Sequence, residues 1–453
     1  MDLEQDRKQC LEKLIWATDQ LQVEVAEAEL GKIADIIVQT MTGPWRCFHT
    51  PGHIFAVGGS ENAIEVLAAL FHDVVYVQVD RSINFNLTYY IAPFIRQVGE
   101  QLVILESTEL PRDLMFEMVM SVFGLAPGQV LSPMAGQNEF LSALVGAKVL
   151  EGFVKPEILV QIVTCIEATI PFRGRSPEGL TPSEGLYGRL QSTNSKFDLK
   201  LTDTQMRSAV RQAVRLSNRD VGGFGHPSAV HFMDNTWSLL LETNHNLKNS
   251  TTYTVHEYRM ALQKMEGFMH FMKPELVFNQ FDGEPNDRDY RSLLANSKQN
   301  IEIGRIYLGS KLASIAILEA LSLRFGHDIP LSTMVAGGLP EEGSGDPLSD
   351  MLPIIEKHYE PKTEIECEVL KLLEVGRTKS STYDIKNSPL TTFMVKYQGF
   401  DEILYQLKWA KDFFKGNISA EDFISGCDPH VLQVVINGVV KVFDSRKAAL
   451  CSS

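Results

Sequence analysis

The stretch Leu67-Ala-Ala-Leu-Phe-His72-Asp73-Val-Val-Tyr76 combines an apolar helix with two side chains that could bind a cation. Apolar residues are nearly continuous over residues 63–75, which predicts a buried helix with His72 and Asp73 near its C-terminal end. An imidazole and a carboxylate side by side in such a place are costly to bury unless each has a hydrogen bond or a metal as its partner. The stretch therefore predicts a helical core with a cation site at its edge.

Helical spacing of apolar residues recurs along most of the chain and predicts a mainly α fold. At Thr50-Pro51 a capping hydroxyl precedes proline, which is typical of a helix start and places His53 in the first turn. We expect further helices over residues 9–41, 138–150, 157–169, 204–218, 253–272, 290–324, 364–373 and 400–414. Residues 429–443 predict either a helix or a strand pair around Asn437-Gly438.

Two stretches interrupt the helical pattern. Residues 80–137 are mixed, with a short strand expected over residues 102–105, and we interpret them as an insertion of uncertain fold. Residues 171–188 are rich in Gly, Pro and Ser and predict irregular backbone.

The length of 453 residues exceeds one ordinary domain. Gly, Pro and acidic residues concentrate over residues 336–347, where few contacts would cross the chain. We therefore predict a helical domain over residues 1–335, a linker over residues 336–350, and a smaller, mostly helical C-terminal unit of unknown role over residues 351–453.

Composition argues against several classes of partner. With 42 basic and 57 acidic residues the formal charge is -15, which disfavours binding to nucleic acid. No apolar run reaches the roughly 18 residues of a membrane helix, so we expect no membrane segment. The cysteines form no CxxC pair, which fits a reducing cytoplasm: Cys10, Cys47, Cys165, Cys367, Cys427 and Cys451. An apolar set on the C-terminal helices is interpreted as core in preference to a homo-oligomer interface: Leu404, Leu407, Trp409 and Phe413.

Several motifs in a fixed order carry a family resemblance. Arg46-x-x-His49-x-x-x-His53 is followed by the His72-Asp73 stretch, by Asn138-Glu139-x-x-Ser142-Ala143, by Ile166-x-Ala168-Thr169 and, further on, by Leu216-Ser-Asn-Arg-Asp220. This order resembles the HD superfamily of metal-dependent phosphohydrolases, which implies a helical HD-domain bundle. The resemblance covers roughly residues 30–305, apart from residues 80–137.

The resemblance implies that His53, His72 and Asp73 are metal ligands and that Asp220 completes the set. The donors would suit Mn, Fe, Co, Ni, Zn or Mg. Glu139 would lie close to the metal and orient water or accept a proton, and Arg173 would bind a phosphoryl oxygen. Relatives often carry a further histidine after the Ala-Thr pair, where this chain has Ile170, and this departure puts a second metal in doubt.

Other interpretations of the same residues stay open. His72 and Asp73 could be a satisfied core pair, and His49 could hydrogen-bond a carbonyl instead of a metal. Asp220 could cap a turn, and Glu139 could interact with its helix dipole. Arg173 and Arg175 could be solvated loop charges, which is the interpretation that the residues alone favour.

Together these features predict a divalent-metal-dependent phosphohydrolase that acts on a small phosphorylated molecule, a phosphate ester or a nucleotide, through metal-activated water. The alternative belongs to another class: a catalytically silent regulatory or scaffolding module that binds a metal or ligand without turnover. The C-terminal helices outside the resemblance and the long insertion favour that alternative.

Overall fold

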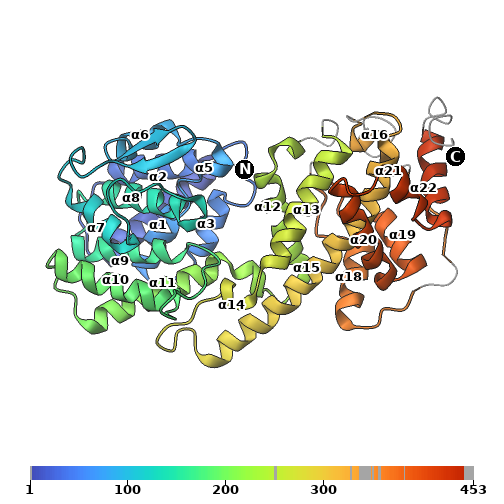
Figure 1. The fold of residues 1–453 in the computed structure, drawn as a ribbon. Helices are drawn as coiled ribbons and strands as arrows, with labels where there is room; N and C mark the ends of the chain where they lie inside the picture. Colours follow the sequence, from blue (N-terminus) through green and yellow to red (C-terminus); the bar gives the residue numbers. More distant parts are fainter. Residues whose placement is uncertain are drawn as a thin grey trace. The chain divides into compact units, whose positions relative to one another are not determined.

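A computed structural model describes residues 3–248, 253–326, 329–335, 348, 351–355, 359–381 and 383–442 (Figure 1). Helices dominate this part of the chain, and its one sheet has two strands. The predicted mainly α fold is confirmed. None of the helices in the described ranges is both long enough and apolar enough to cross a membrane.

The chain forms two compact units, and each consists of two separate stretches of sequence. Unit 1 contains residues 1–225 and 273–295, and unit 2 contains residues 226–272 and 296–453. This division differs from the predicted boundary at residues 336–350, most of which lie outside the described residues. The physical reason is that the C-terminal helices share a core with helices from residues 229–322, as shown below, instead of forming a separate accessory unit.

Unit 1 is a helical bundle built around α4 (Ala63–Phe71), which is buried along its whole length. Five helices lie against α4: α1 (Leu3–Gln20), α3 (Pro51–Val57), α8 (Gln137–Leu150), α9 (Pro156–Ala168) and α11 (Asp203–Asp220). At the crossing of α4 and α8, Gly146 allows close approach, because a Cβ there would lie 3.1 Å from the ring of Phe71. Burial of α4 on all sides fixes the position of its C-terminal end, where His72 and Asp73 follow.

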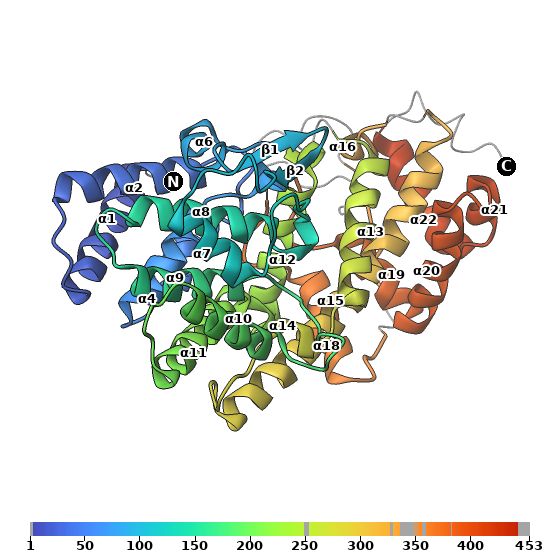
Figure 2. The ribbon, with the colours of Figure 1, turned by 60° about the vertical axis from the view of Figure 1, so that its left-hand side comes forward.

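The remaining elements of unit 1 surround this bundle. They are α2 (Glu27–Met41), α5 (Val77–Asp80), α6 (Phe85–Ile91), α7 (Leu114–Phe123), α10 (Pro182–Lys196) and α14 (Pro274–Val277). Strands β1 (Ile95–Val98) and β2 (Gln101–Ile104) form an antiparallel hairpin, with Ile95 opposite Ile104 (Figure 2). The strand expected over residues 102–105 is therefore present. The segment 80–137 also adds α7 to the core through Phe116 and Val119, so it is an integral part of unit 1.

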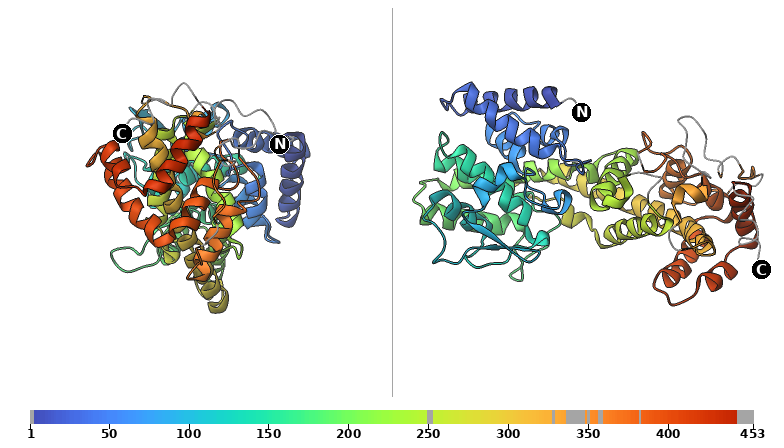
Figure 3. Two further views of the ribbon diagram at one scale, coloured as in Figure 1. Left: turned by 90° about the vertical axis from the view of Figure 1, so that its right-hand side faces the viewer. Right: turned by 90° about the horizontal axis from the view of Figure 1, so that it is seen from above.

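Unit 2 joins α12 (Ala229–Thr243), α13 (Val255–Phe271) and most of α15 (Asp287–Ser322) to the C-terminal helices. Those helices are α16 (Leu331–Val335), α18 (Glu364–Glu374), α19 (Pro389–Gln398), α20 (Phe400–Phe414), α21 (Ala420–Ser425) and α22 (Pro429–Val442). In Figure 3 the yellow-green and orange-red segments of this unit lie in one helical bundle. The choice between helix and strand pair at residues 429–443 is settled in favour of helix as far as Val442.

A buried carboxylate holds unit 2 together. Oδ2 of Asp384 accepts hydrogen bonds from Trp237 Nε1, Tyr258 OH and Lys311 Nζ, each at 2.9 Å. These donors come from α12, α13 and α15, so the segment before α19 is tied to three earlier helices. This convergence explains why residues 351–442 do not separate from residues 226–322.

Most predicted helices are present, and several helices were missed, of which the longer ones are α7, α10, α12 and α19. Helix α10 begins inside the segment expected to be irregular, and α12 was not anticipated. Thr181 caps α10 through a reciprocal capping box with Glu184, and Pro182 occupies its first position. This cap is readable from the sequence, and it marks a helix that the surrounding Gly and Pro residues obscured.

Glu65 is a second buried acid that fixes the bundle, this time in unit 1. Its side chain is fully buried, and it pairs with Arg215 and Arg219 of α11 at 2.6 Å each. Ser60 donates a further hydrogen bond to Glu65. The pair of arginines thereby ties α11 to α4.

We expect Glu65→Ala to lower the free energy of unfolding of unit 1 by about 2 kcal/mol, because it removes two ion pairs of a buried carboxylate. The loss is limited because Arg215 keeps Glu284 as a partner and both arginines are partly exposed to water. Chemical denaturation followed by circular dichroism measures this loss. The control is Glu12→Ala, whose exposed carboxylate lies 3.9 Å from Lys8 and should contribute less than about 1 kcal/mol. Equal losses in both variants would contradict a structural role for Glu65.

Candidate metal centre

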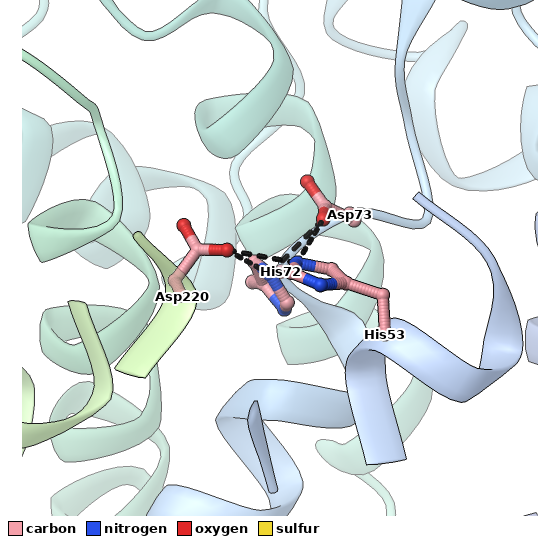
Figure 4. Close-up of side chains that lie close together, drawn as sticks. All are labelled: His53, His72, Asp73 and Asp220. Carbon is pink, nitrogen blue, oxygen red and sulfur yellow. Dashed lines mark hydrogen bonds and ion pairs between the residues drawn. The ribbon is translucent and has the colours of Figure 1, made fainter. Parts of the chain in front are cut away.

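Four side chains from three helix ends meet at one point in unit 1 (Figure 4). His53 lies in the first turn of α3, where Pro51 begins the helix. His72 caps the C-terminus of α4 and Asp73 follows it, whereas Asp220 is the last residue of α11. The structure therefore brings Asp220 next to residues that precede it by about 150 positions in the sequence.

The distances between these groups are short. Nε2 of His53 lies 2.9 Å from Oδ1 of Asp220 and 3.7 Å from Oδ2 of Asp73. Nε2 of His72 lies 3.0 Å from Oδ2 of Asp73 and 3.4 Å from Oδ1 of Asp220. One ligand atom from each residue lies within 4.8 Å of every other, so the four residues could hold a metal ion.

The ring of His72 has a defined orientation. Its Nδ1 lies 2.7 Å from the carbonyl oxygen of Ala69, which can only accept, so Nδ1 carries a proton and donates it. In the neutral ring the lone pair is then on Nε2, the atom that faces Asp73 and Asp220. A backbone carbonyl that fixes the second nitrogen in this way is a common feature of histidines that bind metals.

Contacts to the main chain hold the segment after α4 in place. Buried Arg46 donates from Nη1 to the carbonyl oxygen of Asp73 at 2.7 Å, and its guanidinium forms a two-point ion pair with Asp80 at 2.6 and 3.1 Å. Ser142 accepts a hydrogen bond from the backbone N–H of Val75 at 3.0 Å. Asn138 accepts one from that of Val77 at 3.1 Å. Arg46, Asn138 and Ser142, which sequence analysis noted as motif residues, thus hold the backbone that carries His72 and Asp73.

The end of α11 is held as firmly. Arg219 donates from Nε to the carbonyl oxygen of Val57 at 2.8 Å and pairs with Glu65, which joins α11 to both α3 and α4. Asn218 forms two hydrogen bonds with the backbone of Asn279, each at 2.9 Å. These residues flank Asp220 directly, so the position of its carboxylate follows from its neighbours.

The opposite charges in the cluster shift the pKa values of their neighbours so that each charged form is favoured. Burial would lower the pKa of His72, but Asp73 and Asp220 outweigh it and raise this pKa well above its usual value. Burial would raise the pKa of both carboxyls, yet the neighbouring histidines lower the pKa of Asp73 strongly and that of Asp220 to about 2. Without a metal, the cluster is therefore most stable with both aspartates charged and His72 protonated.

Glu139 lies in the first turn of α8 with its side chain turned into the interior. Its Oε2 is buried and makes no hydrogen bond. Burial, together with the charges of Asp73 and Asp220, raises the pKa of Glu139 to about 7. A carboxyl group with such a pKa can exchange a proton at neutral pH.

Arg173 is already engaged by a protein carboxylate. Its guanidinium pairs with buried Glu167 at 2.6 Å and donates to the carbonyl oxygens of Glu167 and Ile170. Arg189 pairs with the same carboxylate at 2.5 Å. If Arg173 binds a phosphoryl oxygen, as predicted, it must do so while its guanidinium stays paired with Glu167.

His49 lies beside the cluster. Its ring centroid is 5.5 Å from that of His53 and 4.7 Å from that of Tyr76. It also contributes to the lowered pKa of Asp73. His49 is not one of the four residues whose ligand atoms lie together.

The donors fit a divalent cation. Nε2 of His72 and Oδ2 of Asp73 are buried and form no hydrogen bond, although they lie within 3.0 Å of each other. Nitrogen and oxygen ligands of a transition metal, bound at about 2.1 Å, lie roughly 3 to 4 Å apart, as most of these atoms do. A cation would replace the ion pair between these two atoms with a contact to each of them.

The four residues of the cluster were predicted as ligands, but the side chains that position them were not. Glu65, Arg215 and Arg219 were overlooked. Two signals could have indicated them. One is a single acid within the apolar stretch of residues 63–71, and the other is an arginine at every fourth position from residue 207 to 219.

Comparison of the chain with protein-family models, characterised proteins and solved structures gives no match. Nothing beyond the motifs themselves therefore identifies an HD domain.

We expect a metal ion that binds at pH 7 to displace about one proton from the metal-free protein, because the raised pKa keeps His72 protonated and a histidine ligand must be neutral. The two carboxyls, with lowered pKa values, release none. Calorimetric titration of Mn²⁺ in buffers with different heats of ionisation counts the protons. Affinity should rise with pH until the pKa of His72 is passed. Metal binding without proton release at pH 7 would contradict the assignment of His72.

The same pKa directions predict how the stability of the metal-free protein depends on pH. The raised pKa of His72 stabilises the fold below about pH 6.5, and this contribution is lost as the pH rises through the folded-state pKa. The lowered pKa of Asp220 stabilises the fold above about pH 4, and this contribution is lost as the pH falls toward 2. The midpoint temperature of thermal unfolding of the metal-stripped protein should therefore reach a maximum between these two pH values. In His72→Gln the midpoint should fall less steeply as the pH rises above that maximum.

Asp220→Asn distinguishes a metal ligand from a turn-forming residue. If the carboxylate binds the metal, the substitution should weaken metal affinity at least tenfold, because the amide keeps the size but loses the charge. If Asp220 only caps the turn, asparagine should serve as well. The matched control is Asp203→Asn at the other end of α11, where affinity should stay unchanged.

Proposed function

We propose that the protein is a divalent-metal-dependent phosphohydrolase of the HD type, which hydrolyses a small phosphate ester or nucleotide. The observation that carries the proposal is the convergence of His53, His72, Asp73 and Asp220, with a buried Nε2 and a buried Oδ2 that lack hydrogen-bond partners. The class of reaction is inferred from the order of the motifs in the sequence, which resembles that of the HD superfamily.

A divalent cation in such a site supplies Lewis acidity, which activates water and polarises a phosphoryl oxygen. The chain's own residues contribute the rest. His53 and His72 hold neutral nitrogens toward the site, and the two aspartates balance the charge. Only Oδ2 of Asp73 faces the histidines, so its Oδ1 can accept a hydrogen bond from the attacking water and orient it.

Glu139 is suited to proton transfer because its pKa is about 7. In the proposed reaction the water oxygen bonds to phosphorus and the bond from phosphorus to the leaving oxygen breaks. The water gives up a proton, and the leaving oxygen gains one. Glu139 would carry the proton between them.

The second candidate is a regulatory or scaffolding module that binds a metal without turnover. One observation favours it: the guanidinium of Arg173 is paired with Glu167, so the arginine expected to bind phosphate is already neutralised. In the described residues no arginine forms an ion pair with Asp73 or Asp220.

The deciding experiment is elemental analysis of the purified protein, followed by assays on a panel of phosphate esters and nucleotides with Mn²⁺, Mg²⁺, Co²⁺ or Ni²⁺. We expect stoichiometric metal and turnover of at least one substrate. His72→Ala and Asp73→Ala should abolish both while helix content is kept. Stoichiometric metal without turnover would favour the regulatory module, and absence of metal would remove both candidates.

Glu139→Gln tests proton transfer separately from metal binding. We expect kcat to fall about 10²- to 10⁴-fold while the bound metal stays stoichiometric, because the amide cannot exchange a proton. The rate of the parent enzyme should also change near pH 7, and the variant should lose that dependence. The control is Glu157→Gln, a first-turn glutamate of α9, which should leave kcat unchanged.

A further inference from the structure

A pocket of about 690 Å³ lies in unit 1 between residues 173–184 and residues 275–290. Its volume is in the range of pockets that bind small molecules, about 300 to 1,000 Å³. None of the four residues of the metal centre lines it. It is therefore a second place in unit 1 where a ligand could bind.

Most charged groups of this pocket are already satisfied by the protein. Arg173 pairs with Glu167, and Arg207 pairs with Asp203 at 2.9 Å. Glu184 accepts the backbone N–H of Thr181 in the cap of α10. These groups contribute to the shape of the pocket but offer little to a charged ligand.

Two groups of opposite charge remain available. Arg175 uses Nη1 to donate to the carbonyl oxygen of Gly179, and its other guanidinium N–H groups have no partner in the described ranges. Glu275 forms neither a hydrogen bond nor an ion pair within that same part of the chain. Both act on Tyr290: burial raises the pKa of its hydroxyl, Glu275 raises it further, and Arg175 lowers it.

Arg175 and Glu275 thus flank the same tyrosine without pairing with each other. Such an arrangement favours a ligand that carries one positive and one negative group. A polyanion would meet Glu184, Glu275 and Asp282, whereas a polycation would meet three arginines. A neutral molecule would leave Arg175 and Glu275, which are both exposed, to water.

We propose that this pocket binds a small zwitterion. Its carboxylate or phosphate group would lie on Arg175, its ammonium group on Glu275, and its apolar part against Leu276 and the half-buried ring of Tyr290. The proposal is independent of phosphohydrolase activity, because it uses none of the metal-centre residues.

The wall of the pocket is held in place before a ligand arrives. Phe278 and Phe281 are buried, and Asn279 between them is fixed by the two hydrogen bonds to Asn218. On the other side, the capping box of Thr181 and Glu184 fixes the start of α10. A rigid wall lowers the ordering cost of binding.

The test is a thermal-unfolding screen of the full chain with the common amino acids and with phosphoethanolamine, each at about 10 mM, followed by calorimetry of those that shift the midpoint. The amino acids carry a carboxylate and phosphoethanolamine carries a phosphate, so the screen distinguishes the two anionic groups. Each amino acid that binds is compared with its N-acetyl derivative, which lacks the ammonium charge, and with its amide, which lacks the carboxylate charge. Phosphoethanolamine is compared with its N-acetyl derivative and with ethanolamine.

We expect at least one zwitterion to bind and both single-charge derivatives to bind at least tenfold more weakly. Arg175→Gln and Glu275→Gln should each weaken binding at least tenfold. The matched controls are Arg112→Gln and Glu100→Gln, exposed charges that do not line the pocket, and these should bind as the parent does. Absence of binding by every zwitterion, or equal binding by the parent and both pocket variants, would overturn the proposal.

Discussion

The main constraint on unit 1 is that two imidazoles and two carboxylates lie at one point within an apolar bundle. Desolvation of four such groups is costly, and mutual pairing recovers only part of the cost, since Nε2 of His72 and Oδ2 of Asp73 remain without hydrogen bonds. The bundle tolerates this because each contributing helix end is fixed by other contacts. The cluster is therefore held together by its surroundings, and a cation would remove the remaining cost.

Glu65 and Arg46 are the main parts of those surroundings, and they act in different ways. Glu65 forms ion pairs with two arginines of α11 and so sets the distance between the helices that carry His72 and Asp220. Arg46 acts on the backbone instead, through the carbonyl oxygen of Asp73. One contact fixes a spacing between helices and the other fixes the course of the chain, and the geometry of the cluster requires both.

The helical pattern, the helix start at Thr50-Pro51 and the adjacent His-Asp pair are local signals, and they predicted that His53, His72 and Asp73 lie at helix ends. Asp220 lies far along the chain and was predicted as a ligand only through the resemblance of the motif order. The sequence also predicted most helices from local signals. It did not predict the division into units, because Asp384 meets Trp237, Tyr258 and Lys311 only after the chain has folded. Nor did it predict that Glu167 would engage Arg173, since the charge of an arginine is visible in a sequence and its partner is not.

The side chains that hold the metal centre in place mostly contact backbone atoms: Arg46 reaches a carbonyl oxygen, whereas Ser142 and Asn138 accept from N–H groups. Every amino acid has a backbone carbonyl, and every amino acid except proline has a backbone N–H. Evolution could therefore replace His53, His72, Asp73 or Asp220 without disturbing the contacts that shape the bundle. Selection for metal binding alone would preserve those four residues. A lineage released from that selection would lose the ligands and keep the fold.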